Sequence, residues 1–130
     1  MTPEASAYLA KARQCLSNAR ASLGFGLSND AGRGAYLAAF HTSQALIFER
    51  TGKAAKTHQG VQSELHRLAL NEPRIDKVFP PFLTQAYNLK TVADYETGVN
   101  SDIPPERSAA AIETASSFLD CITGLLGADT

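Results

Sequence analysis

The stretch Asn-Leu-Lys-Thr-Val-Ala-Asp-Tyr-Glu-Thr-Gly at residues 88–98 holds three side chains that could do chemistry, Lys90, Asp94 and Tyr95. A lysine can contact a phosphate, and an aspartate four residues later on a helix can pair with that lysine. For an isolated pair of this kind, an exposed ion pair worth about 0.3–0.5 kcal/mol is the more common structure. Tyr95 follows Lys90 by five residues, which is about 140° around a helix. The two side chains therefore cannot easily meet on one substrate within a single chain.

A second group of polar residues is a basic loop with Arg50, Lys53 and Lys56, followed by the predicted helix N-cap Thr57 and the first-turn residue His58. The three cations could contact phosphates or an acidic partner, and a solvated loop is an equally good interpretation. His58 would lie among exposed backbone donors and could meet an anion, although a local capping role is more common there. Anion contact and plain solvation both stay open for this segment.

Metal and cofactor chemistry find little support in the remaining candidates. His41 falls on a close-packed helix stripe, where a core histidine hydrogen-bonded across the helix interface is more common than a general base. His41, His58 and His66 form no i, i+4 pair, and Cys15 and Cys121 have no second ligand at metal-binding spacing. The cysteines fit packed thiols better than a disulfide. We predict no metal and no cofactor, and no phosphate-cradling glycine loop or nucleophile elbow is present.

Helix-start and helix-end signals divide the chain into the elements that must position these residues. The predicted helices cover about residues 3–23, 30–51, 57–70, 80–97 and 105–126. Gly24 is expected to form the left-handed C-terminal cap of the first helix, and Gly52 and Gly98 to end the second and fourth. The Ser-Asn-Asp sequence at 28–30 is expected to cap the start of the second helix.

The second predicted helix is apolar on most sides and should lie at the centre of the fold. Its residues Gly34, Ala38, His41 and Ala45 form a narrow stripe of mostly small side chains, which would let another helix approach closely. No alternating apolar pattern predicts a strand. Short connections between these helices predict an all-α fold, an up-and-down antiparallel bundle of four to five helices.

Composition is that of a globular protein. The chain has 130 residues, of which 44% are hydrophobic and 19% charged, so we expect one domain over residues 1–130. Residues 1–92 hold 11 basic and 6 acidic side chains, whereas residues 93–130 hold 1 and 7. This asymmetry indicates complementary packing or an oriented surface field, and it is not the balance of a dedicated nucleic-acid binder. With no leader-like N-terminus and no uninterrupted apolar run of membrane-spanning length, cytoplasmic localisation is expected.

Three segments, in this order and spacing, resemble the HEPN (higher eukaryotes and prokaryotes nucleotide-binding) domain family. They are Arg33-Gly-Ala-Tyr36-Leu-Ala-Ala-Phe40-His41 with Ala45-Leu46 after it, Lys56-Thr57-His58-Gln-Gly60-Val61, and Lys90-Thr-Val-Ala93-Asp94-Tyr95. The small stand-alone prokaryotic members are the most similar branch, and the resemblance covers about residues 30–122. It implies a helical bundle, commonly a homodimer, that is often encoded beside a minimal nucleotidyltransferase as a toxin–antitoxin-type pair.

Active members of the family are metal-independent endoribonucleases whose arginine and histidine, four to six residues apart, face their symmetry mates across a dimer cleft. The resemblance places Lys90 in the arginine position and Tyr95 in the histidine position, with Asp94 between them, as the predicted catalytic residues. Lysine offers a phosphate a point charge rather than a planar fork, and tyrosine titrates far above neutral pH. RNA or nucleotide contact in the cleft is therefore expected more firmly than cleavage, since tyrosine can still stack on a base.

Further residues acquire expected roles from the same resemblance. The RNA- or nucleotide-binding candidates are Arg50, Lys53, Lys56 and His58, and the structural or supporting residues are Arg33, Tyr36, His41 and Thr57. The competing hypothesis is a non-catalytic interaction module that docks a partner protein through the acidic C-terminal helix or the basic 50–58 loop. Enzymatic activity stays open between these two readings.

Overall fold

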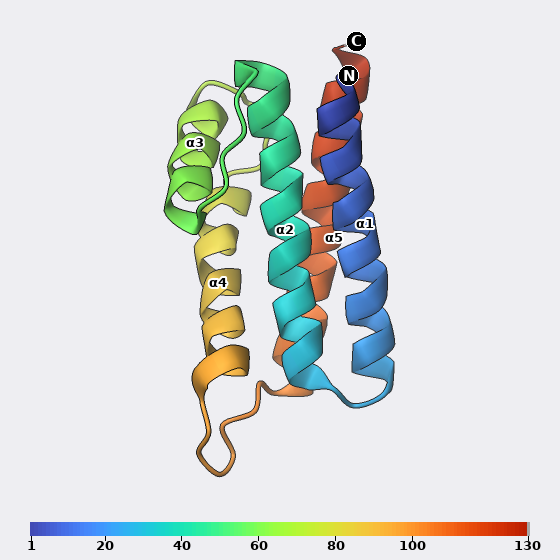
Figure 1. The fold of residues 1–130 in the computed structure, drawn as a ribbon, viewed down its shortest axis with the longest axis vertical. Helices are drawn as coiled ribbons and strands as arrows, with labels where there is room; N and C mark the ends of the chain where they lie inside the picture. Colours follow the sequence, from blue (N-terminus) through green and yellow to red (C-terminus); the bar gives the residue numbers. More distant parts are fainter. Residues whose placement is uncertain (130) are drawn as a thin grey trace.

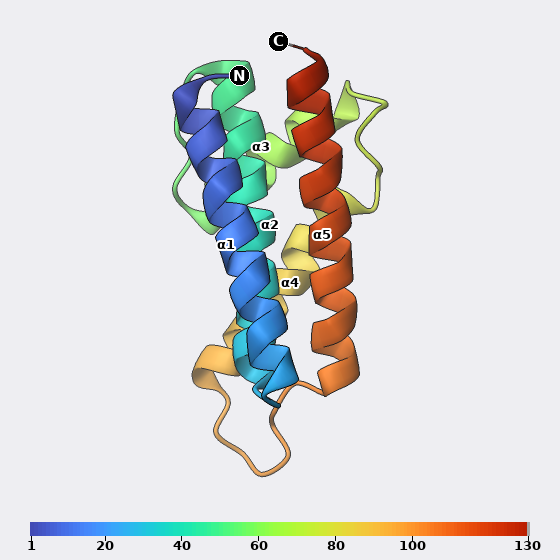
Figure 2. The ribbon, with the colours of Figure 1, turned by 90° about the vertical axis from the view of Figure 1, so that its right-hand side faces the viewer.

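A computed structural model describes residues 1–129, which form five α-helices; Thr130, the end of the predicted domain, lies outside the described residues. The helices are α1 (Pro3–Gly24), α2 (Ser28–Thr51), α3 (His58–Leu70), α4 (Phe79–Tyr95) and α5 (Pro105–Ala128). Figure 1 shows α1 and α2 running in opposite directions, as α4 and α5 do, with the short α3 beside α2. Both termini lie at the same end of the molecule (Figures 1 and 2). The predicted helical bundle is confirmed.

The central position of α2 follows from its small side chains. This helix contacts all four others, and most of its residues between Ala31 and Ile47 are buried. A Cβ atom added to Gly34 would lie 2.8 Å from the Cβ of Ala19 on α1, closer than side chains normally approach. The small-residue stripe therefore does what its sequence predicts, because α1 packs directly on the α2 backbone.

Several predicted helix ends are confirmed. The Thr2 hydroxyl accepts a hydrogen bond from the Ala5 N–H at 3.1 Å, and the Thr57 hydroxyl accepts one from the Gly60 N–H at 3.0 Å. Each satisfies a backbone donor that the first turn of a helix leaves free. Gly52 ends α2 in the left-handed conformation, with φ of 73°.

Three other predicted ends are wrong. Gly24 is the last residue of α1 rather than its left-handed cap, and the left-handed residue is Gly26, with φ of 78°. Residues 28–30 form the first turn of α2 instead of capping it, because the Asn29 side chain is used elsewhere: its Oδ1 accepts from the Ile103 N–H at 2.9 Å. Helix α4 ends at Tyr95, short of Gly98, because the backbone is already extended at the next residue.

The uneven charge distribution appears as ion pairs between the two parts of the chain. Arg20 pairs with Glu113 at 2.7 Å and Arg33 with Asp94 at 2.6 Å. Arg50 and Arg74 form further pairs of this kind with Asp129. Complementary packing is thus the interpretation of the charge asymmetry that the fold supports.

The C-terminal helix is the most apolar element. Although no uninterrupted apolar run is long enough, α5 is the one helix within residues 1–129 that could cross a membrane by length and composition alone, and 44% of its most apolar stretch is buried inside the bundle. Its inward face carries fully buried Phe118 and Ile122. Cys121 is a free thiol that donates to the Arg74 carbonyl at 3.4 Å, and Cys15 is also unbridged.

Candidate functional site

The last turns of α4 carry the three residues that the sequence marks as catalytic candidates. The Lys90 Nζ donates to Asp94 Oδ2 at 2.8 Å, so the predicted i, i+4 pair is formed. These side chains are 29% and 22% exposed, whereas Tyr95, the last residue of the helix, is 72% exposed. Lys90 is thus held by its neighbour, and Tyr95 is left to meet solvent or another molecule.

A guanidinium from the neighbouring helix joins this pair. Arg33 on α2 donates from Nε to Asp94 Oδ1 at 2.6 Å and from Nη1 to Asp30 Oδ1 at 2.6 Å. The Lys90 ammonium and the Arg33 guanidinium hold the pKa of the Asp94 carboxyl below its usual range, and the hydrogen bond to Asp94 raises the pKa of each cation. Position 90 of α4 is a lysine and has no planar guanidinium, but the Arg33 guanidinium of α2 lies beside it.

An aromatic cluster adjoins the ion pairs. The Tyr36 hydroxyl and His58 Nδ1 are hydrogen-bonded at 2.9 Å. The His58 ring stacks on Tyr87 with centroids 3.9 Å apart and planes 16° apart, and Tyr36 meets Tyr87 edge-on at 5.5 Å. Burial raises the pKa of Tyr36 and lowers that of His58, because both charged forms lose solvation. Both groups are therefore neutral at pH 7.

The two clusters form one surface because of helical spacing. Arg33 and Tyr36 are three residues apart on α2, and Tyr87, Lys90 and Asp94 follow at intervals of three and four on α4, so each set shares a helix face. The helices are antiparallel neighbours, which sets Arg33 opposite Asp94 and Tyr36 opposite Tyr87. We call this set the polar-aromatic strip; it consists of Arg33, Tyr36, His58, Tyr87, Lys90 and Asp94.

The basic loop divides between two places. Arg50 turns away from the strip and pairs with Asp129, near the C-terminus, at 2.5 Å. Lys53 and Lys56 are exposed and make no ion pair within residues 1–129. His58 makes no capping hydrogen bond, because Thr57 already fills that position. Of the four predicted RNA- or nucleotide-binding residues, His58 is the one that joins the strip.

The hydrogen bond of His41 differs from the prediction. Its Nδ1 lies 2.7 Å from Gln44 Oε1 on the same helix, because residues three apart share a face of α2. Gln44 Nε2 in turn donates to the Ala55 carbonyl at 2.8 Å. The prediction of a core histidine bonded across a helix interface is therefore wrong: His41 is half-buried and, through Gln44, helps to hold the loop before α3. Burial lowers the pKa of His41.

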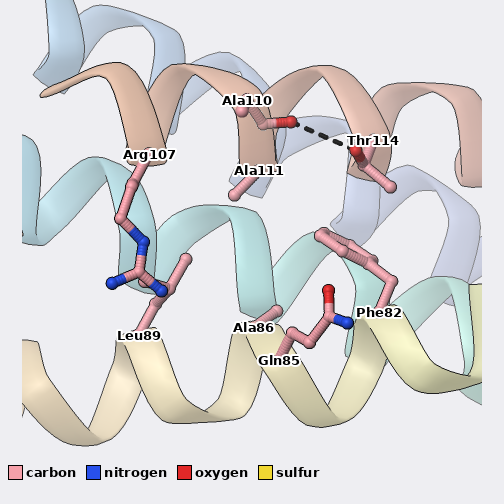
Figure 3. A pocket seen from close by; sticks show the side chains of 8 residues that line it. All are labelled: Phe82, Gln85, Ala86, Leu89, Arg107, Ala110, Ala111 and Thr114. Atoms are coloured by element: carbon pink, nitrogen blue, oxygen red, sulfur yellow. Dashed lines mark hydrogen bonds between the residues drawn. The ribbon is translucent and has the colours of Figure 1, made fainter. Parts of the chain in front are cut away.

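Another face of α4 borders an open groove next to α5. Figure 3 shows an apolar floor with the Arg107 side chain reaching across it. The groove has a volume of about 200 Å³, and the Thr114 hydroxyl on its wall donates to the Ala110 carbonyl at 3.2 Å. It is lined by Phe82, Gln85, Ala86, Leu89, Arg107, Ala110, Ala111 and Thr114. Leu89 and Lys90 are adjacent, so the groove and the strip occupy neighbouring faces of one helix.

The sequence does not predict the contacts of the strip that join different helices, such as the Arg33–Asp94 ion pair and the His58–Tyr87 stack. The usable signal was the spacing of three between Arg33 and Tyr36 and between Tyr87 and Lys90, which places a polar and an aromatic residue on one face of each helix. Only the packing of α4 on α2 shows that these two faces meet.

The helical bundle thus gathers an arginine from α2, a histidine from the start of α3 and a lysine from α4 on one surface. Comparison with known proteins defines the class further. The model of the HEPN domain matches residues 5–125. A protein of Methanocaldococcus jannaschii named "Putative toxin MJ0605" is 33% identical over 120 residues, which are 92% of this chain and 86% of that protein. The chain belongs to the HEPN domain family.

Proposed function

We propose that this HEPN protein is the toxin-type member of a nucleotidyltransferase-linked toxin–antitoxin module in the cytoplasm, and that it binds RNA or a nucleotide. In this proposal two chains form a homodimer, and the ends of their α4 helices, with Lys90, Asp94 and Tyr95, line a shared cleft. Cleavage there is weak and independent of metal. The relative named as a toxin, at 33% identity, supports the first part of the proposal.

The observation that carries RNA contact is the convergence of Arg33 and Lys90, from two helices, beside an exposed Tyr95. Two cations side by side can meet one phosphate, and a tyrosine ring can stack on a base. Lys90 and Tyr95 point away from each other on one helix, so a second chain supplies a natural way to bring both onto one ligand.

Binding of a labelled single-stranded RNA, measured by fluorescence anisotropy over a series of salt concentrations, tests the proposal. Lys90→Ala should weaken binding and reduce the salt slope by about one, because one phosphate contact is lost. Tyr95→Ala should weaken binding about tenfold through lost stacking. Lys11→Ala is the matched control, since Lys11 is an exposed lysine of α1, which does not contact α4. Equal binding by all four proteins would remove the cleft from the proposal.

The dimer and the partner need separate measurements. Sedimentation should show a dimer that Tyr95→Arg weakens, because two positive charges would then face each other across the cleft. Co-purification should recover a nucleotidyltransferase encoded next to this protein. A monomer at all concentrations would contradict the shared cleft, whatever the RNA affinity.

One observation favours the second candidate, a non-catalytic module that docks a partner protein. Asp94 already pairs with both Arg33 and Lys90, so these cations have an internal partner in place of a phosphate. Exposed Lys53 and Lys56 would then serve the docking surface. A partner that stays bound after nuclease treatment, together with no RNA binding, would favour this candidate over the first.

A further inference from the structure

The imidazole of His58 is held on two sides and open at its far nitrogen. Tyr36 occupies Nδ1, and the face of the ring lies on Tyr87. The Nε2 atom has no hydrogen-bond partner within residues 1–129. The buried side-chain polar atoms that lack a hydrogen-bond partner are Gln62 Oε1 and Thr123 Oγ1. His58 Nε2 is not among them, so this unpaired atom is not enclosed. A half-buried histidine with one nitrogen fixed and the other accessible is arranged to exchange protons with a ligand.

The Tyr36 hydroxyl can serve either form of this ring. When it accepts a hydrogen bond from Nδ1–H, Nε2 carries a lone pair and is a base; when it donates a hydrogen bond to Nδ1, Nε2–H is a donor. Tyr36 is 3% exposed and its pKa is raised by burial, so it stays protonated and can rotate between the two roles. The Tyr36–His58 pair can thus take up a proton at Nε2 without placing a charge on the tyrosine.

Position connects His58 to the cations. Tyr87, which stacks on His58, precedes Lys90 by one helical turn, a rise of about 4.5 Å. Tyr36, which bonds His58, follows Arg33 by the same interval. An imidazole and two cations, the groups that metal-independent cleavage of a phosphodiester requires, therefore adjoin each other along one chain's surface.

We propose that His58 is the proton-transfer residue for RNA cleavage by this chain, with Tyr36 as its positioning residue; this rests on the proposed RNA-binding function. His58 Nε2 takes the proton of a ribose 2′-hydroxyl, and that oxygen forms a bond to the adjacent phosphorus. The bond from phosphorus to the 5′ oxygen breaks, and the proton passes to that oxygen. The products are a 2′,3′-cyclic phosphate and a free 5′-hydroxyl. Arg33 and Lys90 offset the negative charge on the phosphoryl oxygens.

The protonation state of His58 agrees with this role. Burial lowers its pKa, so the imidazole is neutral at pH 7 and can accept a proton. The aromatic rings that contact it are Tyr36 from α2 and Tyr87 from α4, and the pKa shift arises from burial with no contribution from a charged side chain. Cleavage should therefore decline on the acid side, as the imidazole becomes protonated below its ordinary titration range.

The test compares RNA cleavage and RNA binding by the same purified proteins. His58→Ala should lower kcat about 100-fold or more while RNA affinity changes less than about threefold. Added imidazole should restore part of the rate, since the space between Tyr36 and Tyr87 can admit it, and Tyr36→Phe should lower kcat about tenfold with KM unchanged. His66→Ala is the matched control, because His66 is an exposed histidine of the same helix outside the strip. Products are identified by their 2′,3′-cyclic phosphate ends.

Each other outcome overturns the inference in a recognisable way. Equal cleavage by His58→Ala and the natural protein removes His58 from the chemistry. A natural protein that binds RNA without cleaving it overturns the inference and leaves the RNA-binding proposal standing. No RNA binding by the natural protein ends both. A loss of activity in His58→Ala that imidazole does not restore, with a lowered melting temperature, would assign His58 to the fold.

Discussion

Two carboxylates in this molecule, Asp94 and Asp129, each pair with two cations, but the residues next to the two clusters differ. Asp94 lies between Arg33 and Lys90, at 2.6 and 2.8 Å. Asp129 lies between Arg50 and Arg74, at 2.5 and 3.0 Å. Each carboxylate pairs with two cations that are far from each other in the sequence, and each has its pKa lowered by them.

The neighbours of the two carboxylates distinguish their roles. Asp129 joins the ends of α2 and α5 to the loop before α4, and Arg74 also pairs with Glu72 at 2.6 Å. Asp94 lies beside the aromatic cluster with its titratable His58. Ion pairs of similar geometry therefore give no functional signal by themselves; the histidine and tyrosines within the next helical turn do.

The largest expected effect comes from the scaffold that both carboxylates share, since Arg33 and Arg50 both project from α2. Gly34→Ala would place a Cβ 2.8 Å from the Cβ of Ala19 and 3.3 Å from its Cα, and this backbone has little room to yield. We expect a loss of about 2 kcal/mol in the free energy of unfolding, measured by urea denaturation. Both ion-pair clusters should weaken together.

The same substitution at Gly124 is the matched control for that prediction. Gly124 lies exposed within α5, and an added Cβ meets nothing within 4 Å. Gly124→Ala should stabilise the protein by about 0.5–1 kcal/mol, because alanine loses less backbone entropy in a helix. If both variants shift stability in the same direction, the close α1–α2 contact is not what limits position 34.

The second prediction separates the two carboxylates by RNA affinity. Asp94→Asn removes one negative charge, which releases Lys90 from its ion pair and leaves Arg33 paired with Asp30 alone. RNA binding at low salt should therefore strengthen about tenfold, with a steeper salt slope. Asp129→Asn makes the same change far from the strip and should alter affinity less than about twofold. Anisotropy titrations with the same RNA measure both. A stronger gain from Asp129→Asn would move the binding surface to the other end of the bundle.

The third prediction concerns stability at low pH, where the ion pairs around Asp129 should have the largest effect. The Arg74 guanidinium lowers the pKa of Glu72 to about 2, and with Arg50 it lowers that of Asp129 to about 2. Because these folded-state values lie below the ordinary ones of 4.5 and 3.8, the stabilisation is present above pH values near the ordinary pKa and is lost as pH falls toward 2. A Glu72→Gln, Asp129→Asn variant lacks this contribution already at neutral pH.

The melting temperature of that double variant should therefore fall less than that of the natural protein between about pH 5 and about pH 2. Circular dichroism melts at intervals across this range measure the difference. The Asp94 pairs are unchanged in both proteins and provide the common background. Parallel curves for the two proteins would show that the Glu72 and Asp129 pairs contribute nothing to acid stability.

The sequence predicts the helices well and the pairings poorly, for a physical reason. Thr2, Thr57 and Gly52 act through local backbone chemistry, so their positions define helix ends directly. Asn29 has the same local preference, yet its side-chain oxygen accepts from the Ile103 N–H, 74 residues away in the sequence. Tertiary competition of this kind has no local signature.

The polar-aromatic strip shows the same limit of prediction from the sequence. The Lys90–Asp94 pair is predictable because both residues are on one helix, and it is present. The third member, Arg33, is 61 residues away in sequence from Asp94, and its role depends on which face of α4 meets α2. The sequence could supply each half of the strip, but only the packing angle of the two helices brings the halves together.

The smallest expected effect is the coupling energy between the two members of a single ion pair. A double-mutant cycle on Arg33 and Asp94 should give about 1 kcal/mol or less, because these side chains are only 32% and 22% exposed but Lys90 remains to compensate Asp94. The same cycle on Arg20 and Glu113, which are 48% and 69% exposed, should give about 0.3 kcal/mol or less. Urea denaturation of the single and double alanine variants measures both. Equal couplings would make the Arg33–Asp94 contact an ordinary surface pair, and the case for the strip would then depend on His58 and its aromatic partners alone.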